Sequence, residues 1–170
     1  MLGVQPGCVL RGNLIHDINK AHYGAWCIYP DEGSAHLTIE DNVCYRTNDN
    51  VFHQHYGREN IVRNNILAFG AEALIKHSRI DAWHRALSFY HNVLIVDGEP
   101  VFDLPSIEAH NVASDLNVIW DVGGKPLAFV GRGEIKRVDL AGWQALGYDL
   151  HSLVADPKCA DAVGTDFRLA

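Results

Sequence analysis

The stretch "NIVRNNILAFG", residues 60–70, decides the fold, because four other segments of the chain repeat its pattern. In each segment apolar and polar residues alternate, an Asn follows, and two or three apolar residues come next. Strict alternation of this kind predicts a β-strand with one buried face. The other copies are "GCVLRGNLIHDI" (7–18), "HLTIEDNVCYRT" (36–47), "ALSFYHNVLIVDG" (86–98) and "VASDLNVIWDVGG" (112–124).

The Asn of each repeat stands at the end of the alternating run. These residues are Asn13, Asn42, Asn65, Asn92 and Asn117, with spacings of 29, 23, 27 and 25 residues. Asn tolerates the left-handed backbone conformation and can bond to neighbouring backbone groups, so we expect it to form a tight bend between two strands. Identical side chains at one bend of successive turns can stack as a ladder of amide hydrogen bonds.

A second set of apolar runs lies between the Asn segments. They are "YGAWCIYPDEG" (23–33), "DNVFHQHYG" (49–57), "AEALIKHS" (71–78), "EPVFDLP" (99–105) and "KPLAFV" (125–130). One turn of short strands in about two dozen residues indicates a solenoid. A β-sandwich would need hairpin turns such as NG or DG, and only the DG at 97–98 qualifies. The sequence therefore predicts an all-β protein, a right-handed parallel β-helix of about five turns.

The C-terminal segment follows a different pattern. In "VDLAGWQALGYDLHS" (138–152), Asp139 is the expected N-cap of a short helix that runs to Leu146, and Gly147 is the expected stop. "DFRL" (166–169) reads as a last strand, and Trp143 is expected to pack the helix on the solenoid. We expect one domain, with turns over 1–137 and an irregular helical cap with its strand over 138–170.

Composition excludes several classes of protein. The 170 residues are 48% apolar and carry a formal charge of −7, which disfavours a nucleic-acid-binding protein. No apolar run has the length of a membrane span, and the start of the chain lacks the pattern of a secretory signal. The four cysteines, none in a CxxC pair, are expected to be free buried thiols rather than disulfides: Cys8, Cys27, Cys44 and Cys159.

Candidate catalytic residues come from the second set of runs. His53 and His55 are two apart on an expected strand, so they point to the same side. Stacked turns would place them beside Asp31 and Glu32 of the turn before and beside Lys76 and His77 of the turn after. Glu72 and His84 lie on nearby connections. Such a convergence of carboxylates and imidazoles is typical of an acid/base or metal site.

Two chemistries fit these residues. Glycoside hydrolysis needs two carboxyl groups, one protonated and one ionised. Asp31 or Glu32 supplies one, and Glu72 or Asp103 the other. A Ca²⁺ ion held by Asp31 and Glu32 could instead polarise a small ester or lactone. The alternative without function is a solvated turn at 31–33 and polar histidines that bond to neighbouring turns.

Further residues are candidates for substrate binding. Flat apolar rings complement the faces of sugars, and Trp26, Tyr29, Tyr56, Trp83 and Tyr90 could form such a platform, although alternation suggests that some are core. Arg79 lies on a loop that could form a groove wall. The residues expected to bind substrate are Tyr29, Tyr56, His77, Arg79 and His84.

The chain also resembles a known family. "GAWCIYPDEGS" (24–34), "FHQHYGRENIVRNNILAFG" (52–70) and the closing "GWQALGYDLHSLVADP" (142–157) with "DFRL" are similar to β-helix proteins of polysaccharide breakdown, of the fucosidase/xylanase type. The resemblance implies a carbohydrate-active hydrolase with a poly- or oligosaccharide substrate, from a family whose members are often exported. It also implies that the chain corresponds to the C-terminal turns of such an enzyme.

Other functions stay open beside the hydrolase. The chain could be a non-catalytic carbohydrate-binding module, or a segment that only folds and associates. An open first turn would expose unpaired strand edges, which predicts a homo-oligomer formed through that end.

Overall fold

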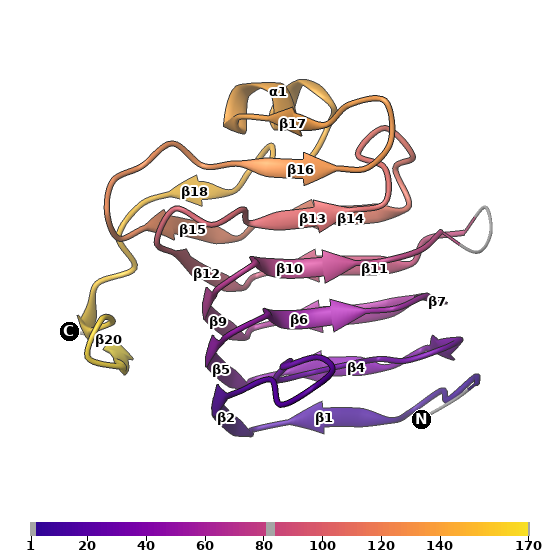
Figure 1. Cartoon of the computed structure of the whole chain (residues 1–170), viewed down its shortest axis with the longest axis horizontal. Helices are drawn as coiled ribbons and strands as arrows, with labels where there is room; N and C mark the ends of the chain where they lie inside the picture. The colour runs from indigo at the N-terminus through magenta and orange to yellow at the C-terminus, as the bar shows by residue number, and fades with distance from the viewer. Residues whose placement is uncertain (1–2, 81–83, 170) are drawn as a thin grey trace.

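The chain folds into the predicted right-handed parallel β-helix of about five turns, in a computed structural model that describes residues 3–80 and 84–169 (Figure 1). Three sheets run along the solenoid, and we name them the first, second and front sheets in the order in which a turn visits them. The front sheet faces the viewer in Figure 1. Successive copies of each repeat pair in parallel, as the spacing of the asparagines predicts.

The first sheet precedes the asparagines, and the second follows them. The first consists of β1 (Val9–Arg11), β4 (Thr38–Glu40), β8 (Asn60–Arg63), β11 (Leu87–Tyr90) and β14 (Val112–Asp115). The second consists of β2 (Leu14–Ile18), β5 (Val43–Thr47), β9 (Ile66–Gly70), β12 (Val93–Val96), β15 (Val118–Asp121) and β18 (Leu153–Val154).

The front sheet completes each turn after the first. It consists of β6 (Asn50–Gln54), β10 (Ala73–His77), β13 (Phe102–Leu104), β16 (Phe129–Gly131) and the antiparallel β17 (Arg137–Val138). A two-stranded pair, β3 (Ser34–Ala35) and β7 (Gly57–Arg58), lies where the front sheet leads back to the first.

The predicted asparagine ladder is confirmed. Each of the first four ladder asparagines donates from its backbone N–H and from its Nδ2 to Oδ1 of the next Asn, at 2.8–3.1 Å for the side-chain bonds. The expected left-handed conformation lies elsewhere, however, because the residue before each ladder Asn has the positive φ. These residues are Gly12, Asp41, Asn64, His91 and Leu116. The bend is thus made by the preceding residue, while the Asn supplies the side chain that bonds across turns.

The core fills the interior of the solenoid. Phe52, Phe89, Phe102 and Phe129 are fully buried, and their rings contact one another from turn to turn. Burial of such large apolar side chains is the main favourable contribution to the stability of the fold.

The C-terminal helix closes one end of the solenoid, as predicted. Asp139 caps α1 (Leu140–Ala145) by accepting a hydrogen bond from the Gly142 N–H at 2.9 Å. Gly147 follows with a φ of 90°. Trp143 is fully buried and stacks on Phe129, with ring centroids 4.4 Å apart.

The last strand packs on the outside of the second sheet. β19 (Cys159–Asp161) and β20 (Asp166–Leu169) form a hairpin, and Phe167 contacts Tyr45 of β5. This hairpin shields the middle of the second sheet from solvent on its outer side.

The first turn departs from the prediction. The run at 23–33 forms no strand, and only Ile28 pairs, with Phe52, in an isolated bridge. Pro30 lacks an N–H, so it only accepts a bond, from the His55 N–H at 3.1 Å, and no second bridge forms there among the described residues. The apolar side chains of the first strands are exposed: Val9 (51%), Leu10 (37%) and Leu14 (64%).

Two other expectations concern the described residues as a whole. No helix in the described part of the chain is long and apolar enough to cross a membrane. All four cysteines are free thiols, as expected, but only Cys44 is buried; Cys27 and Cys159 are half-buried and Cys8 is exposed.

Candidate active site

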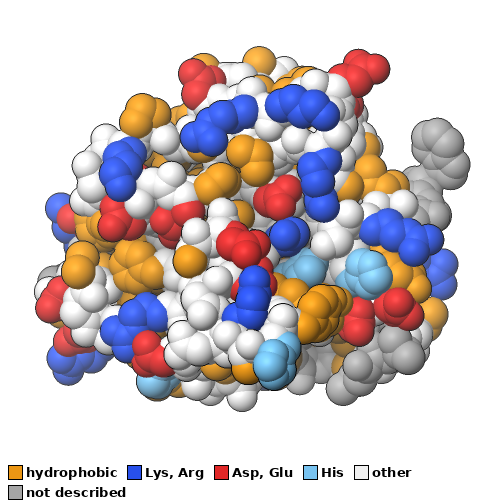
Figure 2. Space-filling view, in the orientation of Figure 1, with side chains coloured by type: hydrophobic (Ala, Val, Ile, Leu, Met, Phe, Trp, Pro, Cys, Tyr) orange, Lys and Arg blue, Asp and Glu red, His pale blue; other side chains and the backbone are white. Residues whose placement is uncertain are grey.

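The outer face of the front sheet carries the chemistry-bearing side chains. Alternation turns Phe52, Ile75 and Phe102 inward, and it turns their neighbours His53, Lys76 and Asp103 outward in one row across the sheet. Figure 2 shows carboxylates, cations and imidazoles gathered over this part of the molecule. The predicted wall of mixed charge is therefore present.

His53 lies at the centre of this face. Its Nε2 is 2.5 Å from Oγ of Ser78, and the rings of Trp26 and Tyr29 pack on the imidazole at 4.6 and 4.9 Å. The side chain is nearly buried, and burial, helped by the positive charge of Lys76, lowers the pKa of His53 to about 4. The imidazole is therefore neutral at neutral pH, so Nε2 can accept the proton of the Ser78 hydroxyl.

Ser78 is fixed from the other side by its backbone. Its N–H donates to the Gln54 carbonyl at 3.0 Å. Arg132 Nη2 donates to the carbonyls of His77 and Ser78, at 2.9 and 3.3 Å. The hydroxyl is thus presented to His53 by a segment held at several points.

Asp31 forms a second centre beside the first. The Tyr29 hydroxyl donates to Asp31 Oδ1 at 2.9 Å, and Nδ1 of His55 lies 3.3 Å from the same oxygen. The backbone N–H of Glu32 and these two side chains lower the pKa of Asp31, so it is ionised at neutral pH. Glu32 is 4.0 Å from His55. The structure therefore brings Asp31, Glu32 and His55 together.

Glu72 belongs to a different group, a line of alternating charges. Lys20 bridges Asp49 and Glu72 at 2.9 and 3.1 Å, and Lys76 lies 3.8 Å from Glu72 and 3.7 Å from Asp103. Burial alone would raise the pKa of Asp49, but its hydrogen bond with Lys20 lowers it. Glu72 is therefore paired with lysines, whereas Asp31 and Glu32 lie within 4.0 Å of His55.

Three of the residues expected to bind substrate line one edge of this face. Tyr56 contacts His55 edge-on at 5.0 Å, and the guanidinium of Arg79 lies 5.0 Å above the Tyr56 ring. Nε2 of His84 is 3.4 Å from the Gly57 carbonyl oxygen, next to Tyr56.

Two predicted residues do not reach this face. His77 is fully buried, because its register partner is the inward-facing Gln54 rather than His53 or His55. This burial keeps His77 off the outer face, and its expected role in substrate binding stays a prediction. Tyr90 lies on the first sheet, in register with Arg63, and is not part of an aromatic platform here. Trp83 lies outside the described residues.

Two functional candidates were not found from the sequence. Tyr23 is 77% exposed and packs edge-on against Trp26, which extends the aromatic surface. Ser78 bonds diagonally to a histidine one turn back. The 23-residue spacing from Asn42 to Asn65 also sets "HQH" at 53–55 against "KHS" at 76–78, a signal that could have identified Ser78.

The described residues give little support to the hypothesis of a bound Ca²⁺ ion. No group of three or more His, Cys, Asp or Glu side chains stands close enough to hold a metal ion, within residues 3–80 and 84–169. Asp31 already accepts hydrogen bonds from Tyr29 and lies within 3.3 Å of His55. A Ca²⁺ ion bound by Asp31 and Glu32 stays a prediction.

Comparisons of the chain with protein-family models, with curated proteins and with solved structures find no match. The resemblance to glycoside hydrolases therefore also stays a prediction, and function must be argued from the site.

Proposed function

We propose that the protein is a carbohydrate-active hydrolase and that bond cleavage takes place on the outer face of the front sheet. The observation that carries the proposal is the 2.5 Å hydrogen bond between Nε2 of His53 and Oγ of Ser78. A nucleophile within hydrogen-bond reach of a neutral base is the first geometric requirement of covalent hydrolysis.

The pair supports cleavage of an ester carried by a sugar. His53 would take the Ser78 proton while Oγ attacks the ester carbonyl, and it would return that proton to the departing alcohol. Water, deprotonated by the same imidazole, would then release the carboxylic acid from Ser78. Lys76 lies beside His53 and would stabilise the negative charge that develops on the carbonyl oxygen.

The surroundings favour a saccharide as the carrier of that bond. Trp26, Tyr29 and the exposed Tyr23 offer ring surfaces within contact of one another. Asp31 and His55 lie directly beside these rings and can bond to hydroxyl groups. Rings next to a few fixed polar groups complement the apolar faces and hydroxyl edges of sugars.

Glycoside hydrolysis is the second candidate, and the Asp31 site favours it. Asp31 is held ionised by its hydrogen bonds, as a nucleophile or base requires. A protonated acid would have to come from Glu32 or from His55, since Asp49 and Glu72 are ion-paired with lysine. This requirement places glycoside hydrolysis behind ester hydrolysis.

The test is turnover of a panel of substrates by wild type and four variants. The panel contains 4-nitrophenyl acetate, acetylated xylo-oligosaccharides, a γ-lactone and 4-nitrophenyl glycosides, each with EDTA and then with Ca²⁺. The variants are Ser78→Ala, His53→Gln, Asp31→Asn and the control Ser88→Ala. Ser88 is a partly buried serine on β11 of the first sheet, outside the site. Circular dichroism confirms that each variant is folded.

Loss of ester turnover in Ser78→Ala and His53→Gln, with Ser88→Ala unaffected, would support the leading proposal. Glycoside turnover lost in Asp31→Asn alone would favour the second candidate, and turnover that needs Ca²⁺ would favour the metal-assisted reaction. A protein that binds oligosaccharide without any turnover is a binding module, and that outcome would reject the hydrolase.

A further inference from the structure

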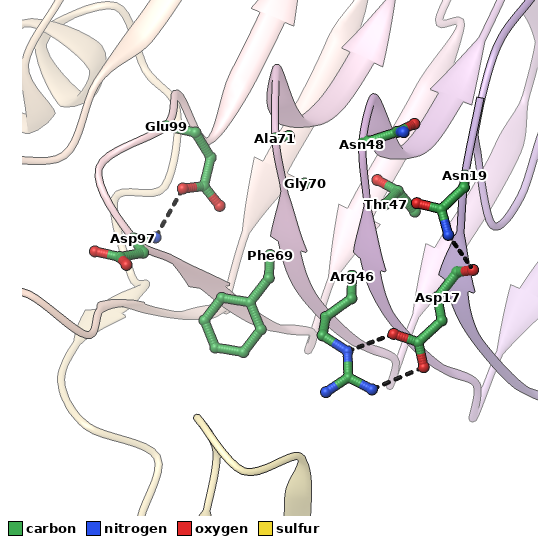
Figure 3. Close-up of a pocket in the computed structure, with 10 residues that line it drawn as sticks. All are labelled: Asp17, Asn19, Arg46, Thr47, Asn48, Phe69, Gly70, Ala71, Asp97 and Glu99. Atoms are coloured by element: carbon green, nitrogen blue, oxygen red, sulfur yellow. Dashed lines mark hydrogen bonds and ion pairs between the residues drawn. The ribbon is translucent and has the colours of Figure 1, made fainter. Parts of the chain in front are cut away.

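A cavity of about 400 Å³ lies on another part of the molecule, at the corner where each turn passes from the second sheet to the front sheet (Figure 3). The first four turns all contribute to its lining. None of the lining residues belongs to the candidate active site. Its volume is in the range of small-molecule sites.

The walls of this cavity are built from outward side chains at one repeating position. Asp17, Arg46 and Phe69 follow directly on residues that are in register, and each has a φ between 54° and 60°. Asp17 and Arg46 form a bidentate ion pair at 2.6 and 2.7 Å. Phe69 packs against the apolar cluster that contains Tyr45 and Phe167, and its ring lies beside this pair (Figure 3).

Two buried oxygen atoms of the lining have no hydrogen-bond partner among the described residues. One is Oγ1 of Thr47, whose residue is only 5% exposed. The other is Oε1 of Glu99, whose Oε2 accepts from the Asp97 N–H at 2.8 Å. Gly70 is in register with Thr47 and has no side chain to cover it. Buried polar groups almost always have partners, so these atoms point to a ligand that supplies them.

The charges of the lining largely cancel. Asp17 is paired with Arg46, and Asp97 is paired with Lys125 at 3.0 Å. Burial raises the pKa of Glu99, which favours its protonated form. A charged ligand would therefore find no free counter-charge, whereas a neutral ligand with several hydroxyl groups would find donors and acceptors.

We propose that this corner cavity binds one neutral sugar ring, which stacks on Phe69 and bonds to Thr47 Oγ1 and Glu99 Oε1. The ring face matches the aromatic wall, and the hydroxyl edge matches the unpartnered oxygens. The proposal does not depend on the hydrolase, because the two sites share no residue.

The test is a ¹⁵N-edited NMR titration of the full chain with D-glucose, D-xylose and L-fucose, with D-glucuronate and D-glucosamine as charged probes. At least one neutral sugar should shift the amides around Thr47, Phe69 and Glu99. Thr47→Val keeps the shape but removes the hydroxyl, and it should weaken binding about tenfold, the effect of one lost hydrogen bond. Thr38→Val, the same change on a strand of the first sheet, should have no effect.

Independence from the active site is measured in the same experiment. Ser78→Ala should leave the titration unchanged, while Thr47→Val should leave turnover of every substrate unchanged. The proposal is overturned if no neutral sugar shifts these amides, if a charged probe binds as well as the neutral sugar, or if Thr47→Val binds like wild type.

Discussion

Two corners of the solenoid differ in whether their residues repeat from turn to turn. Between the first and second sheets the same residue recurs in every turn, and each copy bonds to the next. Between the second and front sheets the corresponding positions hold Asp17, Arg46 and Phe69. Both corners use positive φ, so the backbone bend does not explain the difference. Repetition is confined to the corner whose side chains face inward, and the outward-facing corner is free to vary.

The largest expected effect is at the middle of the repeating corner. Asn65 is buried, accepts from the N–H and Nδ2 of Asn42, and donates to Asn92. Asn65→Ala leaves the Asn42 backbone N–H without an acceptor and leaves Asn42 Nδ2 only the Leu10 carbonyl. The free energy of unfolding should therefore fall by about 3 to 4 kcal/mol in urea titrations. Asn13→Ala, at the exposed end, should cost less than about 1 kcal/mol. Equal losses at both positions would contradict a cooperative ladder.

The second-largest effect is expected on the front sheet, where some buried polar side-chain atoms have no hydrogen-bond partner among the described residues. The pKa of His53 is about 4 in the folded protein and 6.5 is ordinary. Between these values the unfolded chain binds a proton that the folded protein does not. Stability should therefore fall as pH drops from about 6.5 to about 4, by about 3 kcal/mol in all.

The measurement is the urea midpoint at pH 7 and at pH 4.5, for wild type and for His53→Gln. The variant should lose this part of the pH dependence, while His16→Gln, on the exposed face of β2, should keep it. An identical pH dependence in wild type and His53→Gln would show that His53 is not the group responsible.

A smaller effect is expected where the ladder ends. The buried carboxylate of Asp149 accepts from Asn117 Nδ2, Trp143 Nε1 and Ser152 Oγ. Asp149→Asn replaces one accepting oxygen by a donating group, so we expect a loss of about 2 kcal/mol by the same titration. Trp143→Phe removes the indole donor and also leaves a cavity beside Phe129, so it should cost at least as much. If Asp149→Asn left the free energy of unfolding unchanged, the carboxylate would not be needed there.

The smallest effect is expected at the variable corner. Asp17 and Arg46 are exposed, and such ion pairs contribute little because water and salt screen them. Asp17→Asn and Arg46→Ala should leave the urea midpoint within the error of the measurement. A clear loss of stability in either variant would show that this corner also supports the fold.

The ladder could be predicted because one residue type recurs at a readable spacing. Strand alternation gave the outward position of His53 and the inward position of Phe52 for the same reason. The orientation of His77 was missed although alternation alone turns it away from the side of Lys76, toward the interior. The Ser78–His53 bond is diagonal, between residues 25 positions apart, and no pattern within one strand contains it. The corner cavity was missed because its residues differ in every turn.

The end of the ladder at Asp149 gives the row of amides a polarity. Every Nδ2 points toward the C-terminal cap, and a carboxylate can only accept, so the last amide has one permitted orientation. Rotating any single amide by half a turn would set oxygen against oxygen on one side and nitrogen against nitrogen on the other. From Asn42 onward each amide is also held in this sense by the backbone, because its Oδ1 accepts a backbone N–H and its Nδ2 donates to a carbonyl of the first sheet. The direction of the row is therefore fixed in every turn, and the carboxylate of Asp149 ends the row in the same sense.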